Sequence, residues 1–135
     1  MKGIAMERKE FEKCWLESFA ASVSKENIKK YVVSTGNYIW HVFSWKLLPE
    51  ETYLIGDRAR DAYDVADKND AVYIEPFGEG NIKALEREYE SAASLDALTE
   101  VYVASKDFSW TYIKTHENDL CGPYFCQKNE GLKDT

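Results

Sequence analysis

The stretch Val101–His116, VYVASKDFSWTYIKTH, constrains the fold of this chain most strongly, because it has the pattern of a β-hairpin. Its two arms, residues 101–103 and 110–113, consist of the β-branched and aromatic types that suit a half-buried pleated surface. Between them, Ser105-Lys106-Asp107 supplies turn formers, and an Asp side chain can bind its own backbone two residues further on. This stretch therefore predicts two antiparallel strands at the centre of the molecule.

Side chains alternate along a strand, so the second arm has two distinct faces. Trp110 and Tyr112 fall on one face, and Thr111 and Ile113 on the other. His116 and Glu117 follow directly, at the strand's end, where side chains leave the sheet. The best structural signal in the sequence therefore ends beside its best candidates for chemistry.

The remaining segments predict a mixture of helices and strands. Apolar residues at three-to-four spacing predict helices over about residues 7–21, 24–36, 57–68 and 82–93. Apolar runs bounded by turn formers predict strands over residues 37–45 and 71–77. We expect a single α+β domain over residues 1–135, with residues 1–6 and 129–135 frayed. A mostly antiparallel sheet of about four strands would pack against several helices, mainly on one face.

The charge of the chain excludes one class of partner and favours another. With 24 acidic and 17 basic residues the net charge is −7, and no basic run is present. Such a chain repels a phosphate backbone, so we expect no nucleic acid partner. A basic protein partner or a cationic ligand is compatible with this charge.

Cysteine usage and hydropathy bear on the compartment. The three cysteines are an odd number and too few for a disulfide scaffold, which is typical of free thiols in a reducing cytosol. The N-terminus has no apolar signal core, and no run of eighteen apolar residues occurs. We expect a cytoplasmic protein that neither spans nor binds a membrane, and the sequence indicates no cofactor.

One candidate constellation is a metal site near the C-terminus. His116, Cys121 and Cys126 have the spacing H-x4-C-x4-C, and His41 offers a fourth ligand of the type that zinc prefers. This spacing differs from the tight C-x2-C knuckle. Buried thiols around an ordinary Gly-Pro turn are the alternative interpretation, and a Cys121–Cys126 disulfide is a less favoured third.

A second candidate is a catalytic pair of histidines. His41 and His116 are the only histidines, and both fall in or at the end of predicted strands. Neighbouring strands would bring them together, with Glu117 or Asp119 to orient one imidazole. A histidine can also lower the pKa of a nearby thiol. The alternative is a structural role, with His41 as a satisfied core residue.

Two further observations concern binding. Arg58 lies at the start of a predicted helix, where free backbone donors and its guanidinium can meet an anion, although capping and surface ion pairs are the favoured interpretation. The chain also carries more aromatic mass than a small core requires, and displayed aromatic side chains suit a protein interface. Packing in the core is the alternative for each of them. The candidates are Trp40, Trp45, Trp110, Tyr112, Tyr124 and Phe125.

Several sequence blocks, taken together, resemble one known family. They are Trp40-His41-Val42-Phe43-Ser44, Gly56-Asp57-Arg58-Ala59-Arg60 with Ala62-Tyr63-Asp64, Lys106-Asp107-Phe108-Ser109-Trp110-Thr111-Tyr112, Thr115-His116-Glu117 and Cys121-Gly122-Pro123-Tyr124-Phe125. This set is similar to the DUF4275 family of small uncharacterised bacterial proteins, found mainly in Bacillus-like organisms. The resemblance covers about residues 15–125 and includes both histidines. It implies no established activity.

These observations favour a non-enzymatic, acidic binding protein of the immunity or antitoxin type, which acts on a basic protein partner. The alternative is a small hydrolase or transferase that uses His116 with Glu117, and His41 opposite.

Overall fold

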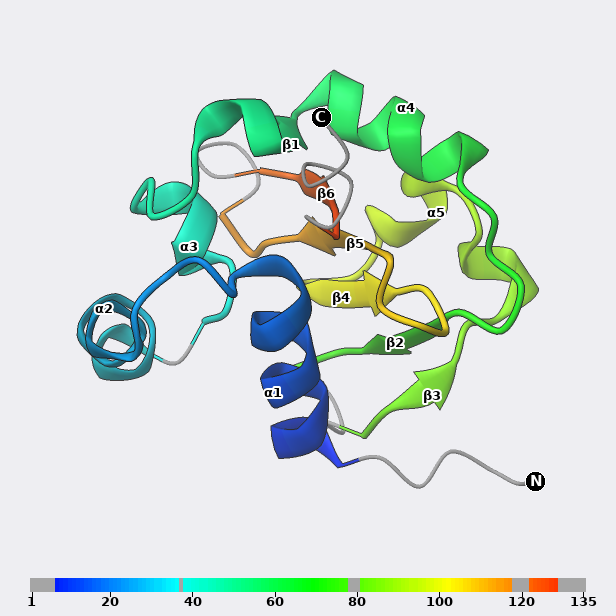
Figure 1. Ribbon diagram of the computed structural model, residues 1–135. Coiled ribbons are helices and arrows are strands. Elements are labelled where there is room, and N and C mark those ends of the chain that lie inside the picture. The colour runs from blue at the N-terminus through cyan, green and yellow to red at the C-terminus, as the bar shows by residue number, and fades with distance from the viewer. Residues whose placement is uncertain (1–6, 37, 78–80, 118–121, 129–135) are drawn as a thin grey trace.

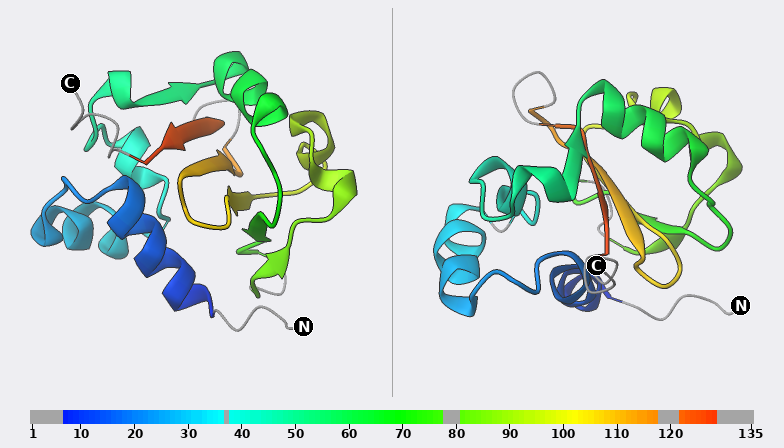
Figure 2. Two further views of the ribbon diagram at one scale, coloured as in Figure 1. Left: turned by 45° about the vertical axis from the view of Figure 1, so that its right-hand side comes forward. Right: turned by 45° about the horizontal axis from the view of Figure 1, so that its top comes forward.

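An antiparallel sheet lies between two layers of helices in the computed structural model, which describes residues 7–36, 38–77, 81–117 and 122–128 (Figures 1 and 2). The six strands in this part of the chain have the order β1-β6-β5-β4-β2-β3. The elements, in chain order, are α1 (Arg8–Phe19), α2 (Lys25–Tyr31), the 3-10 turn η1 (Val33–Thr35), α3 (His41–Ser44), η2 (Glu50–Thr52), β1 (Tyr53–Ile55), α4 (Asp57–Val65), β2 (Val72–Ile74), β3 (Lys83–Ala84), η3 (Arg87–Tyr89), α5 (Ala92–Leu95), β4 (Val101–Ala104), β5 (Trp110–Lys114) and β6 (Tyr124–Gln127).

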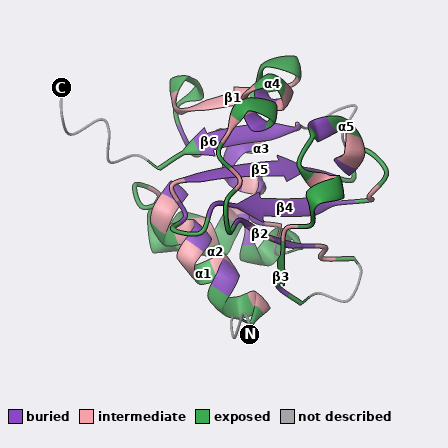
Figure 3. Ribbon diagram, turned by 90° about the vertical axis from the view of Figure 1, so that its right-hand side faces the viewer, coloured by how far each residue is buried: buried purple, intermediate pink, exposed green. Residues whose placement is uncertain are grey.

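The predicted hairpin forms the centre of the sheet. β4 and β5 pair antiparallel, with Val103 opposite Tyr112. Asp107 Oδ1 accepts a hydrogen bond from Ser109 N at 3.1 Å, as its position in the turn predicts. Every residue of both strands is buried, which Figure 3 shows in purple.

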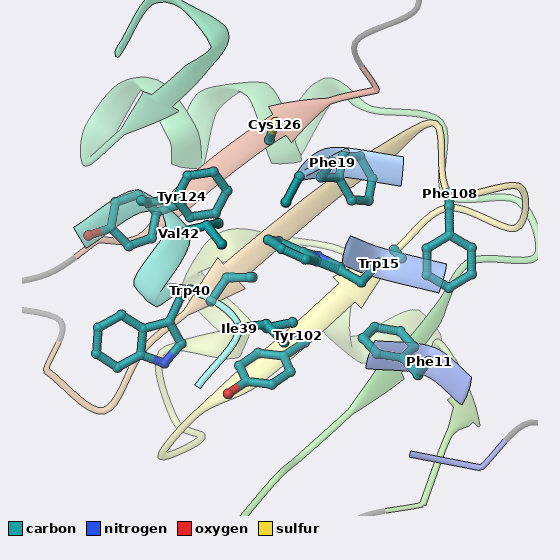
Figure 4. Close-up of a cluster of buried hydrophobic side chains, with 14 of the residues drawn as sticks. Phe11, Trp15, Phe19, Ile39, Trp40, Val42, Tyr102, Phe108, Tyr124 and Cys126 are labelled. Atoms are coloured by element: carbon teal, nitrogen blue, oxygen red, sulfur yellow. The ribbon is translucent and has the colours of Figure 1, made fainter. Parts of the chain in front are cut away.

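Two predictions about the sheet are wrong. The sheet has six strands rather than about four, and helices cover both faces rather than mainly one. We call the two resulting clusters the α1 core and the α4 core. The α1 core includes Phe11, Trp15 and Phe19, which are the buried side chains of α1 (Figure 4). The α4 core includes Tyr63 and Leu95, against which Trp110 and Tyr112 pack.

Three of the predicted helices form, with limits close to those expected. In α1, residues Phe11, Trp15 and Phe19 recur every four positions and are buried. Ser24 caps α2 by accepting a hydrogen bond from Asn27 N at 3.1 Å. α4 begins at Asp57 and buries Ala59 and Tyr63. Of the helices in the described part of the chain, none is long and apolar enough to cross a bilayer.

The strand predicted over residues 37–45 is wrong. Residue 37 lies outside the described residues, and the rest of this segment forms turns and the short helix α3. Its apolar run is continuous, and such a run cannot distinguish a strand from a buried helical segment. The backbone bond from Phe43 N to Trp40 O, at 2.9 Å, is one of several that close this turn. The turn buries Trp40, Val42 and Phe43 in the α1 core.

The helix predicted over residues 82–93 is also wrong, because that segment contains β3, η3 and the start of α5. Ile82 packs in the α1 core, whereas Leu85 and Tyr89 pack against the α4 core. A single helix would have placed these side chains on one face. The sequence analysis also missed β1 and β6, whose three and four residues give too short a pattern.

Candidate functional site

A buried carboxylate lies at the centre of the candidate site. Glu100, directly before β4, is 1% exposed. Its Oε2 accepts hydrogen bonds from the Trp40 indole Nε1 at 3.2 Å and from the Tyr102 hydroxyl, whose ring lies near Trp40 in Figure 4. Burial, with the charge of Glu100, raises the pKa of Tyr102, so the hydroxyl remains a donor. A buried carboxylate requires such donors, because removal from water disfavours its charge.

The other oxygen of Glu100 fixes His116. Oε1 accepts from the backbone N of His116 at 3.0 Å and from its ring Nδ1 at 2.7 Å. A carboxylate only accepts, so Nδ1 donates in this bond. The other ring nitrogen, Nε2, lies 3.7 Å from Glu117 Oε2, a contact that is an ion pair only when the ring is protonated. The His116 side chain is 27% exposed, so the ring is partly accessible to solvent.

His41 reaches the same region from α3. Its Nδ1 lies 2.6 Å from Thr35 Oγ1 and 3.2 Å from the carbonyl oxygen of Tyr31. Because a carbonyl only accepts, Nδ1 must carry a proton to donate to it. Burial lowers the pKa of His41, and a protonated His116 would lower it further. The Tyr31 carbonyl and the charges of Glu117 and Glu100 act in the opposite direction. The two imidazoles are therefore electrostatically coupled.

Aromatic rings connect the two histidines. The Tyr38 ring lies 5.5 Å from that of His41 and 5.2 Å from that of His116, measured between centroids. Phe77 lies 5.2 Å from His116, and Trp45 lies 6.3 Å from His41. We call this set the aromatic–histidine patch. Its members are Tyr31, Tyr38, His41, Trp45, Phe77 and His116.

The structure thus brings His41 and His116 to one place, although by a different route from the predicted pair of strands. His116 follows β5 as expected, whereas His41 lies on a helix. Sequence reasoning missed Glu100, because a glutamate directly before an apolar run reads as an exposed strand end. It also missed Tyr38 and Phe77, which only the tertiary fold places beside His116.

Most of the aromatic residues predicted to bind a partner are instead buried, which corrects that expectation. The exposed fractions are 2% for Trp40, 7% for Trp110, 0% for Tyr112 and 3% for Tyr124. Their burial completes the two cores, while the exposed rings are those of Trp45 and Phe77, at 51% each. Arg58 is exposed at the second position of α4.

The proposed zinc ligands do not gather in the part of the chain that the structure describes. Cys126 pairs with Thr111 in the sheet register, five residues before His116. Five residues of extended chain span on the order of 16 Å, too far for a shared metal ion. Cys121 lies outside the described residues, and the described ones contain no cluster of three potential metal ligands. Burial raises the pKa of the Cys126 thiol to about 12, so this cysteine stays protonated.

Comparison with known proteins identifies the family. A family model described as "Domain of unknown function (DUF4275)" matches residues 4–125. The chain belongs to the DUF4275 family. Comparisons with curated proteins and with solved structures gave no significant match. The DUF4275 match includes Glu100 and both histidines and ends one residue before Cys126, and its description assigns no activity to any of them.

Proposed function

We propose that this DUF4275 protein is a non-enzymatic binding protein whose aromatic–histidine patch contacts a basic protein partner. One observation carries the proposal: Trp45 and Phe77, each half exposed, flank two histidines in a continuous series of ring contacts. Large aromatic side chains of this kind supply most of the binding energy at protein interfaces.

The charge of the protein and the chemistry of the patch both favour a basic partner. The chain carries a net charge of −7, which attracts a cationic surface over a distance. Aromatic faces also bind Lys and Arg by cation–π contact, as Lys30 Nζ already does 5.2 Å above the Tyr31 ring. An immunity-type protein that neutralises a basic toxin would use these features. The free thiols of Cys14 and Cys126 are compatible with a cytoplasmic setting.

Affinity capture tests this proposal. Tagged protein at physiological salt should recover a basic protein from a cell extract, and the double variant Trp45→Ala/Phe77→Ala should lose it. Val65→Ala is the matched control, because Val65 is 84% exposed and lies outside the patch. Capture of no partner, or equal capture by the double variant, contradicts the proposal.

A second candidate function rests on the Glu100–His116 contact. A carboxylate that orients a histidine through Nδ1 leaves Nε2 ready to remove a proton from water or an alcohol, as a small hydrolase or transferase requires. Hydrolysis of a panel of activated esters should then disappear in His116→Gln. Activity unchanged in His116→Gln excludes this candidate.

A further inference from the structure

A groove lies between α1 and α2, and none of its lining residues belongs to the aromatic–histidine patch. Its volume is about 690 Å³, and its floor is apolar. Leu16 and Ala20 come from α1 and the residue after it, and Val23 and Ile28 from the connection and α2. Val33, which is 54% exposed, also lines the groove. Leu16, Val23 and Ile28 also pack against the α1 core, which fixes the floor of the groove.

The rim of this groove is basic, in contrast to the acidic molecule that carries it. Lysines stand on both walls: Lys9 and Lys13 on α1, and Lys25 and Lys29 on α2. Within the described part of the chain, none of these four ammonium groups forms an ion pair. Two glutamates, Glu12 and Glu17, also line the groove, and Arg8 already pairs with Glu12 at 3.0 Å. Over the apolar floor, the four lysines without an ion pair therefore outnumber Glu17, the lining glutamate that forms none among the described residues.

We propose that this groove binds an acidic amphipathic helix of a partner protein. A helix laid in a groove buries one apolar stripe, with anchors at positions i, i+3 or i+4, and i+7, and leaves its other faces in solvent. Acidic residues beside that stripe would meet the lysines on both walls. A fatty acid fits less well, because small ligands bury most of their surface and this groove is open. The site is distinct from the patch and selects the opposite charge.

A designed peptide provides the probe. We expect a fluorescein-labelled helix of about 18 residues, with leucines at those anchor positions and glutamates beside them, to bind the full chain saturably in fluorescence anisotropy. The same peptide with lysines in place of the glutamates should not bind. Raising the salt from about 0.05 M to about 0.5 M should weaken binding at least about tenfold, because exposed ion pairs are screened.

Charge reversal tests whether the acidic peptide binds in the groove or elsewhere on the surface. Lys13→Glu/Lys29→Glu should weaken binding of the acidic peptide at least about tenfold. Lys46→Glu/Lys106→Glu is the matched control, because these lysines are 73% and 74% exposed outside the groove, and it should bind within about twofold of the original chain. Trp45→Ala/Phe77→Ala should also retain binding, so failure of the patch and failure of the groove are distinguishable.

Four outcomes of the peptide experiments would overturn the proposal. They are the absence of saturable binding, equal binding of the lysine peptide, indifference to the Lys13→Glu/Lys29→Glu change, and displacement of the peptide by dodecanoate at lower concentrations than by unlabelled peptide. Sedimentation of the unliganded chain covers a fifth case. A dimer that the same reversal dissociates would make a second copy of this chain the occupant and would equally overturn the proposal.

Discussion

At the scale of single residues, Glu100 organises the candidate site. Its two oxygens receive donors from Trp40 just before α3, from Tyr102 in β4 and from His116, two residues after β5. Each donor loses water when it is buried, so the carboxylate and its donors satisfy one another. Glu100 thereby joins the α1 core to the patch and sets the orientation of His116.

Glu100→Gln is expected to destabilise the fold by about 3 kcal/mol, since a glutamine presents an NH₂ group to donors that need an acceptor. Urea unfolding at neutral pH measures the loss. Glu117→Gln, with a side chain 47% exposed, is the control and should change stability by less than about 0.5 kcal/mol. Similar losses in the two variants would show that burial of Glu100 does not matter.

His41 predicts a pH dependence of stability. Its folded pKa lies below the ordinary value of 6.5, chiefly because burial disfavours the charged ring. The unfolded chain then binds the proton more readily, so the contribution of His41 is complete above pH 6.5 and is lost as the pH falls through the folded pKa. The stability of the original chain relative to His41→Gln should therefore decrease on acidification through this range. An NMR titration midpoint for His41 at or above 6.5 would contradict the assignment.

At the scale of elements, the stability of α2 depends on the capping of its N-terminus. Within α2 no residue is buried, so packing contributes little and the Ser24 cap contributes proportionately more. Ser24→Ala should cost about 1 kcal/mol and accelerate hydrogen exchange at the α2 amides. Ser22→Ala, an exposed position before the cap, should do neither. Unchanged exchange in Ser24→Ala would show that packing of Ile28 alone holds α2.

Gly36 ends the next turn with a φ of +107°, which disfavours any residue with a Cβ. A Cβ there would also lie 2.7 Å from the Tyr38 ring, at the centre of the aromatic–histidine patch. Gly36→Ala should therefore cost about 2 kcal/mol and shift the ring resonances of His41 and His116. Gly56→Ala is the control for the ring contact, because Gly56 also has a positive φ (+70°) but a Cβ there has nothing within 4 Å, so the His41 and His116 resonances should not move. Unmoved ring resonances in Gly36→Ala would exclude the contact with Tyr38.

At the scale of the whole molecule, the two cores share the strands of the hairpin. Tyr102 and Ile113 face the α1 core, while Val103 and Tyr112 face the α4 core. Neither core can lose its packing without exposing strands that belong to both, so the described residues should unfold as one cooperative unit.

Truncation on either side of the sheet tests this cooperativity. Phe11→Ala in the α1 core and Leu95→Ala in the α4 core, both at fully buried positions, should each lower stability by about 2–5 kcal/mol. In both variants circular dichroism and tryptophan fluorescence should report the same unfolding midpoint. Separate midpoints would show that the two layers unfold independently.

Local patterns along the chain were enough to predict several parts of this protein. The alternation of residues 101–113 set the hairpin and its faces, the four-residue repeat of Phe11, Trp15 and Phe19 set α1, and Ser24 set the start of α2. Each of these signals lies within one element, where the period of the backbone fixes which side chains share a face.

The remaining features could not be predicted in this way, because the contacts that set them join segments far apart in the chain. The apolar run around Trp40 became turns and the short helix α3, which bury its rings in the α1 core. Two short strands formed because β6 pairs with the edge of β5 and β1 pairs in turn with β6. The candidate site arose in the same way: the donors of Glu100 are up to 60 positions away in the chain. Burial of that charge required them to converge, and no local period records such a requirement.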